Sequence, residues 1–444
     1  MESAEKPKPH LFARSADLLK LTRGEGIYVW DDKGNRYIDG SAGPICIGIG
    51  HGVKEIAEAA CKQMEKISFA HSSHFTTESV IECADKLAEF SLHSLKHVFF
   101  TSGGSEATEA AAKMARQYHL ERGASSRYKI ISRWQSYHGN TLGALSMSGN
   151  IPRRRKYVPM LVDFPHIPPA YCYRCWFGKT FDDCDRDCAW ALDAEIKAQS
   201  PEHVSAFIAE PIVGATLGTV PAPEGYFQII REICDKHGVL FIADEVMTGF
   251  GRTGKNFGIE HWGVEPDIIA TAKGLSSGYI PLGAVIASDG VFESFKTPFA
   301  HGHTYGSHPV ACAIGAAVVD YLTKHDLVRR SAELGVHFMR RLGELRGHES
   351  VGDVRGIGLF SGIEFVKEKD SKEPYPTEVR FNQRVLSNCF KRRLLVYPGF
   401  GSVDGVRGDH IQVAPPFVVT RSQIDEMAEI LDAAIGEAEQ SNDQ

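Results

Sequence analysis

The sequence lacks the features that mark a membrane-spanning or a nucleic-acid-binding protein. Its 444 residues contain no run of about 18 apolar residues, the length that a membrane-spanning helix requires. Basic residues are not in excess either, because 49 Lys and Arg stand against 56 Asp and Glu, a formal net charge of −7. A chain with this charge is poorly suited to neutralising nucleic-acid phosphates. We therefore expect neither a membrane nor a nucleic acid as a partner.

Internal repeats, low-complexity stretches and targeting signals are absent as well. The first residues include Glu2 and Glu5 and no apolar segment, and the final SNDQ carries no address sequence. These features lead us to expect a cytoplasmic protein. The chain is 43% hydrophobic and 24% charged, so it can bury a large core and needs no disulfide or metal ion for stability.

Most of the ten cysteines are scattered, but four of them lie close together in the sequence. Cys172, Cys175, Cys184 and Cys188 are separated by two, eight and three residues, a spacing that zinc sites also use. The aspartates around Cys184 and Cys188 disfavour the thiolate, which is the form that binds a metal. Whether these thiols bind a metal, pair or stay free is left open, and we expect no catalytic metal site.

Apolar runs alternate with amphipathic helical segments through the middle of the chain. The runs that predict strands are His97–Thr101, Lys129–Arg133, Ser205–Ile212, Val239–Val246, Asp267–Ala272 and Gly283–Ser288. Several are continuously apolar, which is typical of strands buried on both faces of a sheet. After the first run, residues 105–120 carry apolar side chains at helical spacing. This alternation predicts an α/β fold with a mostly parallel sheet and helices on both faces.

We expect three regions from this pattern. Residues 1–60 form an N-terminal segment with a hairpin over Ile27–Tyr37, and residues 61–325 form the large α/β domain. Residues 326–444 form a smaller C-terminal α+β domain. Its predicted elements are helices near Leu327–Arg346, Val379–Arg393 and Arg421–Glu439 and a strand at Gly358–Phe365.

Two further motifs carry little weight. Gly249–Gly254 matches the glycine pattern of dinucleotide-binding turns, but no amphipathic helix follows it. The strand before it ends in Asp244 and Glu245, which would repel a pyrophosphate. His301 and His303 have no carboxylate partner at helical spacing, so we interpret them as loop histidines rather than metal ligands.

A glycine-rich turn precedes the predicted helix at 105–120. In Thr101–Glu106 (TSGGSE), two glycines let the backbone come close to a ligand. The helix start adds free N–H groups and a positive dipole end, which favour an anion such as a phosphate. An ordinary helix cap, formed by Ser102 or Ser105, is the alternative interpretation of the same residues.

Residues suited to catalysis follow three of the predicted strands. Asp244 ends the run VLFIAD, where a buried carboxylate requires a cationic partner. Lys273 follows IIATA, and a lysine removed from water there becomes a usable nucleophile. Tyr137, next to His138, can stack on a flat ring, although a simple packing role is the alternative. An anion cradle, an aromatic face, a carboxylate and an amine are together what pyridoxal 5′-phosphate (PLP) requires.

These residues lie in segments that resemble the class III aminotransferases, PLP enzymes of fold type I that include ω-amino acid and ornithine aminotransferases. The resemblance covers about residues 24–434 and includes SGGSEATEAA, SYHGNTLGA, FIADEVMTGFGRTG, TAKGLSSGYIPLGAV and HTYGSHPVACA. FIADEV followed by TAKG is the most specific part. The family fold implied is a large domain with a mostly parallel seven-stranded sheet flanked by helices, and a smaller α+β domain built from the C-terminal part and the N-terminal segment.

The resemblance also implies a role for each matching residue. Lys273 forms a Schiff base with the cofactor, and Asp244 pairs with the pyridine nitrogen. The other residues that it places at the cofactor are Ser102, Gly103, Gly104 and Ser105 at the phosphate, Tyr137 and Val246 on the two ring faces, His138 beside Tyr137, and Glu210 near the ring hydroxyl and the substrate. Ser102 and Gly103 depart from the usual residues of the phosphate motif, whose backbone N–H groups do much of the binding.

Two more residues are implied to act at the edges of the site. Thr304 resembles the threonine that reaches the phosphate site of the partner subunit, which implies a homodimer. Arg407 is the candidate for binding a substrate carboxylate, although its position before Pro415 differs from the register in many relatives. Glu210 would neutralise this arginine when a substrate with an uncharged side chain enters the site.

The implied reaction moves an amino group from an amine or ω-amino acid donor to a keto acid acceptor, pyruvate or 2-oxoglutarate. It follows ping-pong kinetics through pyridoxamine phosphate, with Lys273 moving the proton. Racemases, epimerases, decarboxylases and aminomutases of the same fold share the lysine and the aspartate, so they remain alternatives, as does a non-catalytic PLP-binding protein. The identity of the donor and the choice of acceptor do not follow from the sequence.

Overall fold

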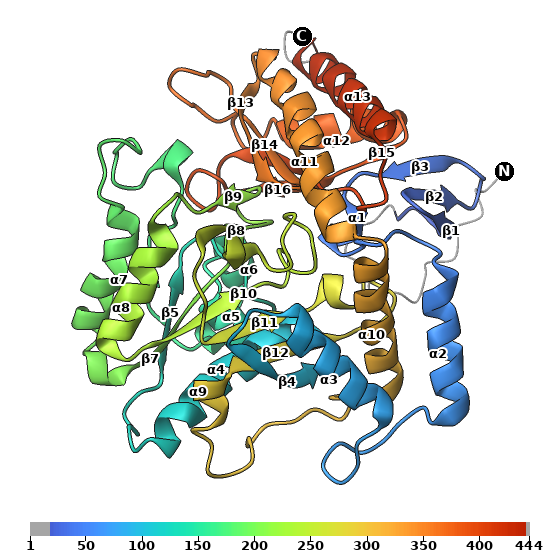
Figure 1. The fold of residues 1–444 in the computed structure, drawn as a ribbon. Coiled ribbons are helices and arrows are strands. Elements are labelled where there is room, and N and C mark those ends of the chain that lie inside the picture. The colour runs from blue at the N-terminus through green and yellow to red at the C-terminus, as the bar shows by residue number, and fades with distance from the viewer. Residues whose placement is uncertain (1–17, 441–444) are drawn as a thin grey trace, which may run out of the picture.

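A seven-stranded sheet forms the centre of the protein (Figure 1), seen in a computed structural model that describes residues 18–440. In spatial order its strands are β4 (Leu95–Thr101), β12 (Gly283–Ser288), β11 (Ile268–Thr271), β10 (Leu240–Asp244), β7 (Val204–Ala209), β5 (Lys129–Arg133) and β6 (His166–Ile167). β12 runs antiparallel to both neighbours, and every other pair is parallel. The mostly parallel seven-stranded sheet expected above is confirmed.

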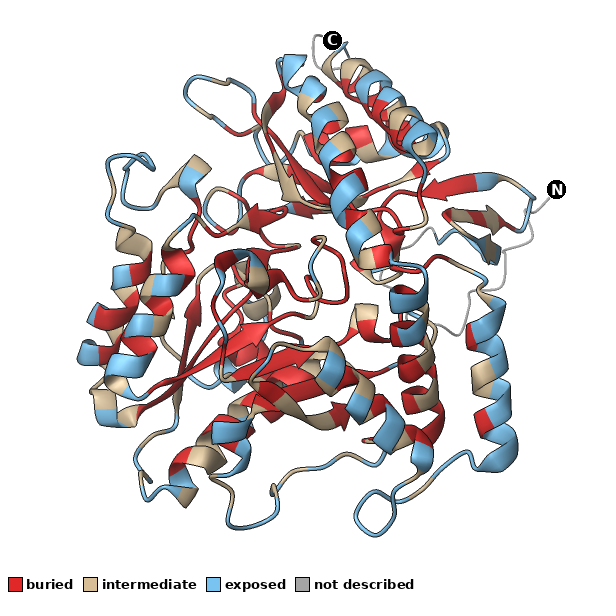
Figure 2. Cartoon of the chain, viewed as in Figure 1, coloured by how far each residue is buried: buried red, intermediate tan, exposed pale blue. Residues whose placement is uncertain are grey.

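The inner strands β7, β10 and β11 are buried on both faces, as their continuously apolar sequences predict (Figure 2). Ile208 and Ile242 pack in one apolar cluster with the alanine-rich helix α4 (Gly104–Glu121). The adjacent Phe207 and Phe241 pack on the other side, where Phe227 of α8 (Tyr226–His237) lies against Phe241. Because side chains alternate along a strand, one apolar run supplies both clusters.

Further helices surround the sheet. They are α1 (Ala42–Ile45), α2 (Lys54–Lys66), α3 (Glu78–Phe90), α5 (Leu142–Met147), α6 (Ile151–Arg154), α7 (Asp187–Ala198), α9 (Asp289–Phe292) and α10 (Pro309–Lys324). α10 packs against α2 and α3, and α7 packs against α8. Among residues 18–440, no helix has the length and apolar character needed to cross a membrane.

Besides the two-stranded sheet of β8 (Ile212–Val213) and β9 (Val220–Pro221), the described residues form two four-stranded sheets, one of which joins the two ends of the chain. The first has the order β1 (Leu21–Glu25), β2 (Tyr28–Asp31), β3 (Arg36–Asp39) and β15 (Leu394–Leu395). The second has the order β13 (Val351–Ile357), β14 (Phe360–Phe365), β17 (Asp409–Val413) and β16 (Tyr397–Phe400), with helices α11 (Leu327–Gly343), α12 (Phe381–Lys391) and α13 (Arg421–Gln440). The parallel pairing of β15 with β3 places the N-terminal hairpin against the C-terminal part. The expected domain boundaries remain a prediction, and residues 1–17 lie outside the described part.

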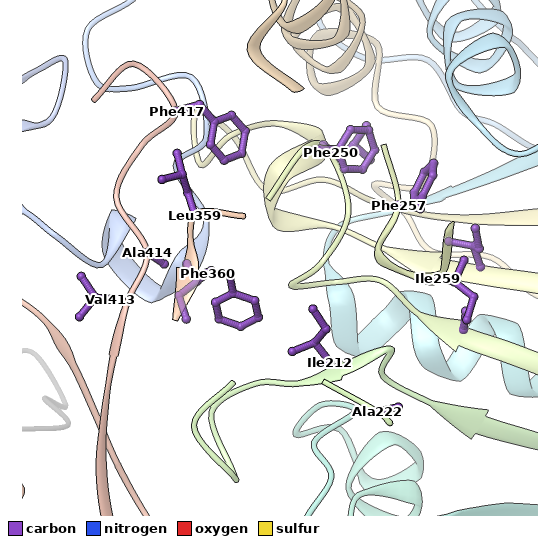
Figure 3. Packing of buried hydrophobic residues seen from close by; sticks show 14 of the residues in the cluster. Ile212, Ala222, Phe250, Phe257, Ile259, Leu359, Phe360, Val413, Ala414 and Phe417 are labelled. Atoms are coloured by element: carbon purple, nitrogen blue, oxygen red, sulfur yellow. The ribbon is translucent and has the colours of Figure 1, made fainter. Parts of the chain in front are cut away.

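The segment after β10 connects the central sheet to the C-terminal sheet. Phe250 belongs to the same apolar cluster as Leu359 and Phe417 (Figure 3). The buried guanidinium of Arg252 donates to the carbonyl oxygens of Leu359 and Pro415 at 3.0 and 2.7 Å. Between β10 and β11, a stretch that the structure describes throughout, the chain forms turns and a short 3₁₀ helix. The glycine pattern at 249–254 is therefore a structural junction and does not open a dinucleotide-binding helix.

Candidate active site

Three residues expected to carry the chemistry, together with the unexpected Arg133, gather at one edge of the central sheet. Arg133 ends β5, Glu210 follows β7, Asp244 ends β10, and Lys273 follows β11. These four strands are parallel, so their carboxyl ends meet at the same edge. The carboxyl edge of a parallel sheet is where α/β proteins bind their ligands.

Asp244 is buried and held in place by two hydrogen bonds. Its side chain is only 3% exposed, and its Oδ2 lies 2.7 Å from Nδ1 of His138. Its Oδ1 accepts the backbone N–H of Val246 at 3.1 Å. An ionised carboxylate only accepts hydrogen bonds and has about four lone-pair directions, so it can still accept a further N–H donor. A protonated ring nitrogen of a ligand is such a donor.

Lys273 combines an unusual backbone conformation with a desolvated amine. Its φ of 41° lies in the left-handed region, which a residue other than glycine enters at an energetic cost and mostly at functional sites. Burial lowers the pKa of Lys273 from 10.5 to about 8, opposed by the negative charge of Asp244. The fold therefore keeps a reactive amine close to the Asp244–His138 pair.

We expect Lys273 in the cofactor-free protein to react as a neutral amine from about pH 8 upward. At pH 7 such a pKa leaves roughly one amine in ten neutral, about 300 times the fraction for an ordinary lysine. Competitive acetylation with acetic anhydride, read by peptide mass spectrometry, measures this reactivity against the exposed Lys255. A Lys273 reactivity that still rises steeply near pH 10.5 would contradict the expectation.

A second buried pair lies one strand further along the edge. Oε1 of Glu210 accepts the backbone N–H of Tyr137 at 3.0 Å, and its Oε2 lies 3.7 Å from a guanidinium nitrogen of Arg133. Burial raises the pKa of Glu210, whereas the charges of His138 and Arg133 lower it. Arg133 was not predicted as a site residue, although an arginine ending the apolar run KIIS is a visible signal. The approach of Arg133 means that Glu210 already has a cation beside it.

The turn before α4 has room for an anion. α4 begins at Gly104, so the N–H groups of its first turn have no acceptor within the helix. A Cβ at Gly103 would meet open space, whereas a Cβ at Gly104 would lie 2.9 Å from Val246. Ser105 accepts the backbone N–H of Asn140 at 3.1 Å, which ties the turn to the loop of Tyr137. The cradle and the Asp244 carboxylate are thus linked through Val246 and the Tyr137 loop.

The donors, acceptors and free space at this edge fit PLP. The open turn at Gly103 suits its phosphate, and the buried carboxylate of Asp244 suits its ring nitrogen. The desolvated amine of Lys273 suits its aldehyde. Among the described residues, Nε2 of His138 and Oε2 of Glu210 are buried without a hydrogen-bond partner, as is common where a polar ligand completes a site.

Two expected site residues lie apart from this cluster. The guanidinium of Arg407 is 53% exposed and pairs with Asp404 at 2.7 Å, and it makes no contact with Glu210 in the part that the structure describes. Thr304 lies on an exposed loop with Tyr305, which is 62% exposed. The pairing of Glu210 with Arg407 considered above is replaced in this structure by its approach to Arg133.

The other metal-ligating side chains show no metal-binding arrangement. Among residues 18–440, no group of three or more His, Cys, Asp or Glu side chains is placed to hold a metal ion. The rings of His301 and His303 meet edge to face at 4.7 Å. The four clustered cysteines are free thiols that line one small cavity, and burial raises the pKa of Cys188 to about 12.

The class of protein that this fold and site define is a PLP-dependent aminotransferase. The chain belongs to the class III aminotransferases, because residues 11–435 match the family described as Aminotransferase class-III. It is 36% identical over 420 residues to the putrescine–pyruvate aminotransferase of Pseudomonas aeruginosa, covering 92% of this chain and 88% of that protein. The protein is therefore an enzyme that transfers amino groups, acts on small molecules and uses PLP.

Solved structures agree with this assignment. A thermostable (S)-enantioselective ω-transaminase from Thermomicrobium roseum is 38% identical, with a TM-score of 0.91 and coverage of 97% of this chain and 96% of that one. The ω-transaminase from Pseudomonas jessenii, solved in complex with PMP, is 31% identical, with a TM-score of 0.91 and coverage of 98% and 96%. The fold type I arrangement expected from the sequence is confirmed.

Proposed function

We propose that the protein transfers an amino group from a small amine or ω-amino acid to a keto acid, pyruvate or 2-oxoglutarate, in two half-reactions at one site. The observation that carries the proposal is the desolvated amine of Lys273 at the sheet edge, acted on by the charge of Asp244. The printed name of the Pseudomonas aeruginosa relative, a putrescine–pyruvate aminotransferase, supports an amine as donor and a keto acid as acceptor.

The proposed roles follow from the geometry at the sheet edge. Bound PLP supplies an aldehyde that takes up the amino group and a ring that withdraws electrons from the reacting carbon. Asp244 keeps the positive charge on the ring nitrogen, and His138 orients that carboxylate. Nζ of Lys273 removes the proton from the substrate carbon and returns it on the cofactor side. Tyr137 and Val246 enclose the ring.

The remaining roles concern the phosphate and the assembly. We assign the phosphate to Ser102, Gly103, Gly104 and Ser105, at the start of α4. In a homodimer Thr304 would reach the phosphate site of the partner subunit, and the exposure of its loop supports that placement. For Arg407 to bind a substrate carboxylate, its ion pair with Asp404 must first open.

The two half-reactions can be observed separately in the holoenzyme. We expect putrescine or 1-phenylethylamine alone to convert the visible absorption of the bound aldehyde into that of the aminated cofactor, because the amino group stays on the enzyme. Pyruvate or 2-oxoglutarate alone should then restore the original spectrum. A donor panel measured against both acceptors identifies the substrates. An enzyme that racemises or decarboxylates its substrate without accumulating the aminated cofactor would contradict the proposal.

A further inference from the structure

Three consecutive arginines at helix α6 have three different environments. The backbone N–H of Arg153 is capped by Asn150 at 3.1 Å, and Arg155 is exposed. The guanidinium of Arg154 donates to three backbone carbonyl groups at the end of α5, at 2.8 to 3.0 Å, so it stabilises the fold. The guanidinium carbon of Arg153 instead lies 4.3 Å from the centre of the Tyr137 ring. Only this arginine of the three is directed to the proposed cofactor site.

Arg153 has no acidic partner in the described part of the chain. Its side chain is half-buried, and among residues 18–440 no carboxylate lies within ion-pair distance of its guanidinium. Arg133 and Arg407, by contrast, lie near Glu210 and Asp404. A guanidinium held on an aromatic face without a counter-ion offers a planar fork of N–H donors to an incoming carboxylate.

A small cavity with both polar and apolar lining residues lies next to this guanidinium. Its volume is about 90 Å³, and its lining includes Arg153, Gln135, Thr216 and Gly401. Gln135 is 2% exposed, and its amide nitrogen donates to the carbonyl oxygen of Gly401 at 2.8 Å. Its amide oxygen is buried without a partner among the described residues. A buried acceptor of this kind requires a donor, such as a water molecule bound together with a carboxylate.

The guanidinium of Arg153 is also close enough to influence the reacting amine. The positive charge of Arg153 contributes to lowering the pKa of Lys273. The same guanidinium lies on the ring of Tyr137, whose backbone N–H donates to Glu210. An anion bound at Arg153 would therefore act electrostatically on the amine of Lys273.

We propose that Arg153 binds the carboxylate of the keto acid acceptor, and of the amino acid formed from it. Amines without a carboxylate react at the same Lys273 without using this arginine, which then stays on the Tyr137 ring. The inference rests on the proposed function and deepens it, because it names the group that separates the two substrates. It assigns to Arg153 the role that sequence reasoning considered for Arg407, whose guanidinium is already paired.

The test compares the two half-reactions in the holoenzyme of an Arg153→Ala variant. Loss of a charge-assisted contact to a carboxylate should raise the KM for pyruvate or 2-oxoglutarate by about 10- to 100-fold. The half-reaction with 1-phenylethylamine, which has no carboxylate, should change much less than the keto-acid half-reaction. Arg153→Lys keeps the charge but not the planar fork, so its KM for the keto acid should lie between those of the wild type and Arg153→Ala. Arg155→Ala, which alters an exposed arginine of the same run, is the matched control.

Each result decides the inference separately from the proposed function. A wild-type enzyme that fails to use a keto acid at all contradicts the proposed function. A working wild type whose Arg153→Ala variant keeps its keto-acid KM overturns the inference, as does an equal loss in both half-reactions. If Arg407→Ala raises that KM and Arg153→Ala does not, the carboxylate binds at Arg407 instead. Activity with the amine that lacks a carboxylate reports that the variant is folded.

Discussion

A Lys273→Ala variant is expected to lose amino transfer by about 10⁴-fold or more, because one side chain performs two tasks. Its amine holds the cofactor's aldehyde, and its free form moves the proton between substrate and cofactor. Neither task passes to another amine, since the described residues around Asp244 and Glu210 contribute a histidine and an arginine but no second lysine. Steady-state turnover of an amine with pyruvate measures the loss.

The same substitution should not weaken the cofactor-free fold. The folded state lowers the pKa of Lys273 to about 8, so it disfavours the charged amine. The cost is about 3 kcal/mol below pH 8 and disappears as the pH rises from 8 toward 10.5. Alanine removes that cost at neutral pH, so thermal unfolding at pH 7 should occur at a temperature no lower than that of the wild type. The left-handed φ of 41° strains lysine and alanine alike, so it does not alter the comparison.

Borohydride reduction gives a readout that does not depend on turnover. In the wild type loaded with PLP, reduction should attach the cofactor permanently to the peptide that contains Lys273. The Lys273→Ala protein should give no such peptide, whereas Lys255→Ala, which alters an exposed lysine, should label like the wild type. Attachment at another lysine in the wild type would show that the amine has been assigned wrongly.

The sheet and the strand-end residues could be predicted because each leaves a local mark in the sequence. An apolar run that stops at one charged residue, as at Asp244 or Lys273, marks both a buried strand and its functional end. The bounds of β5 and β12 were predicted to the residue. β6, with two residues, is too short for any periodicity to appear, so the seventh strand followed only from the family resemblance.

Arg153 and Gln135 could not be predicted, because their positions depend on how the chain folds back on itself. The loop after β5 passes through α5 into α6, where Arg153 returns to the ring of Tyr137. Nothing in a run of three arginines tells which one faces solvent, which one binds carbonyl groups and which one lies on the ring. For Arg407 the sequence showed a cation near the expected place but not its pairing with Asp404.

The second large effect is expected at Asp244. An Asp244→Ala variant should lose amino transfer by about 10³-fold, because the ring nitrogen no longer meets a negative charge and the ring withdraws fewer electrons. The substitution also leaves Nδ1 of His138 without the acceptor that lies 2.7 Å away. Because Asp244 does not itself carry the cofactor, borohydride should still attach PLP to Lys273. The matched control is Asp193→Asn. Asp193 pairs with Lys197 and Lys236 instead of a cofactor, so this variant should keep its turnover.

Chemical rescue separates the charge of Asp244 from its structural contacts. N1-methylated PLP carries a positive ring nitrogen without needing a carboxylate to keep a proton there, and alanine at 244 leaves space for the methyl group. If the charge is the reason for the loss, Asp244→Ala should recover about 10-fold or more of its activity with this analogue. The wild type should not gain, since its carboxylate already supports the charged ring. Equal activity of the variant with both cofactors would mean that the loss comes from the displaced His138 and the loop of Tyr137 rather than from the ring nitrogen.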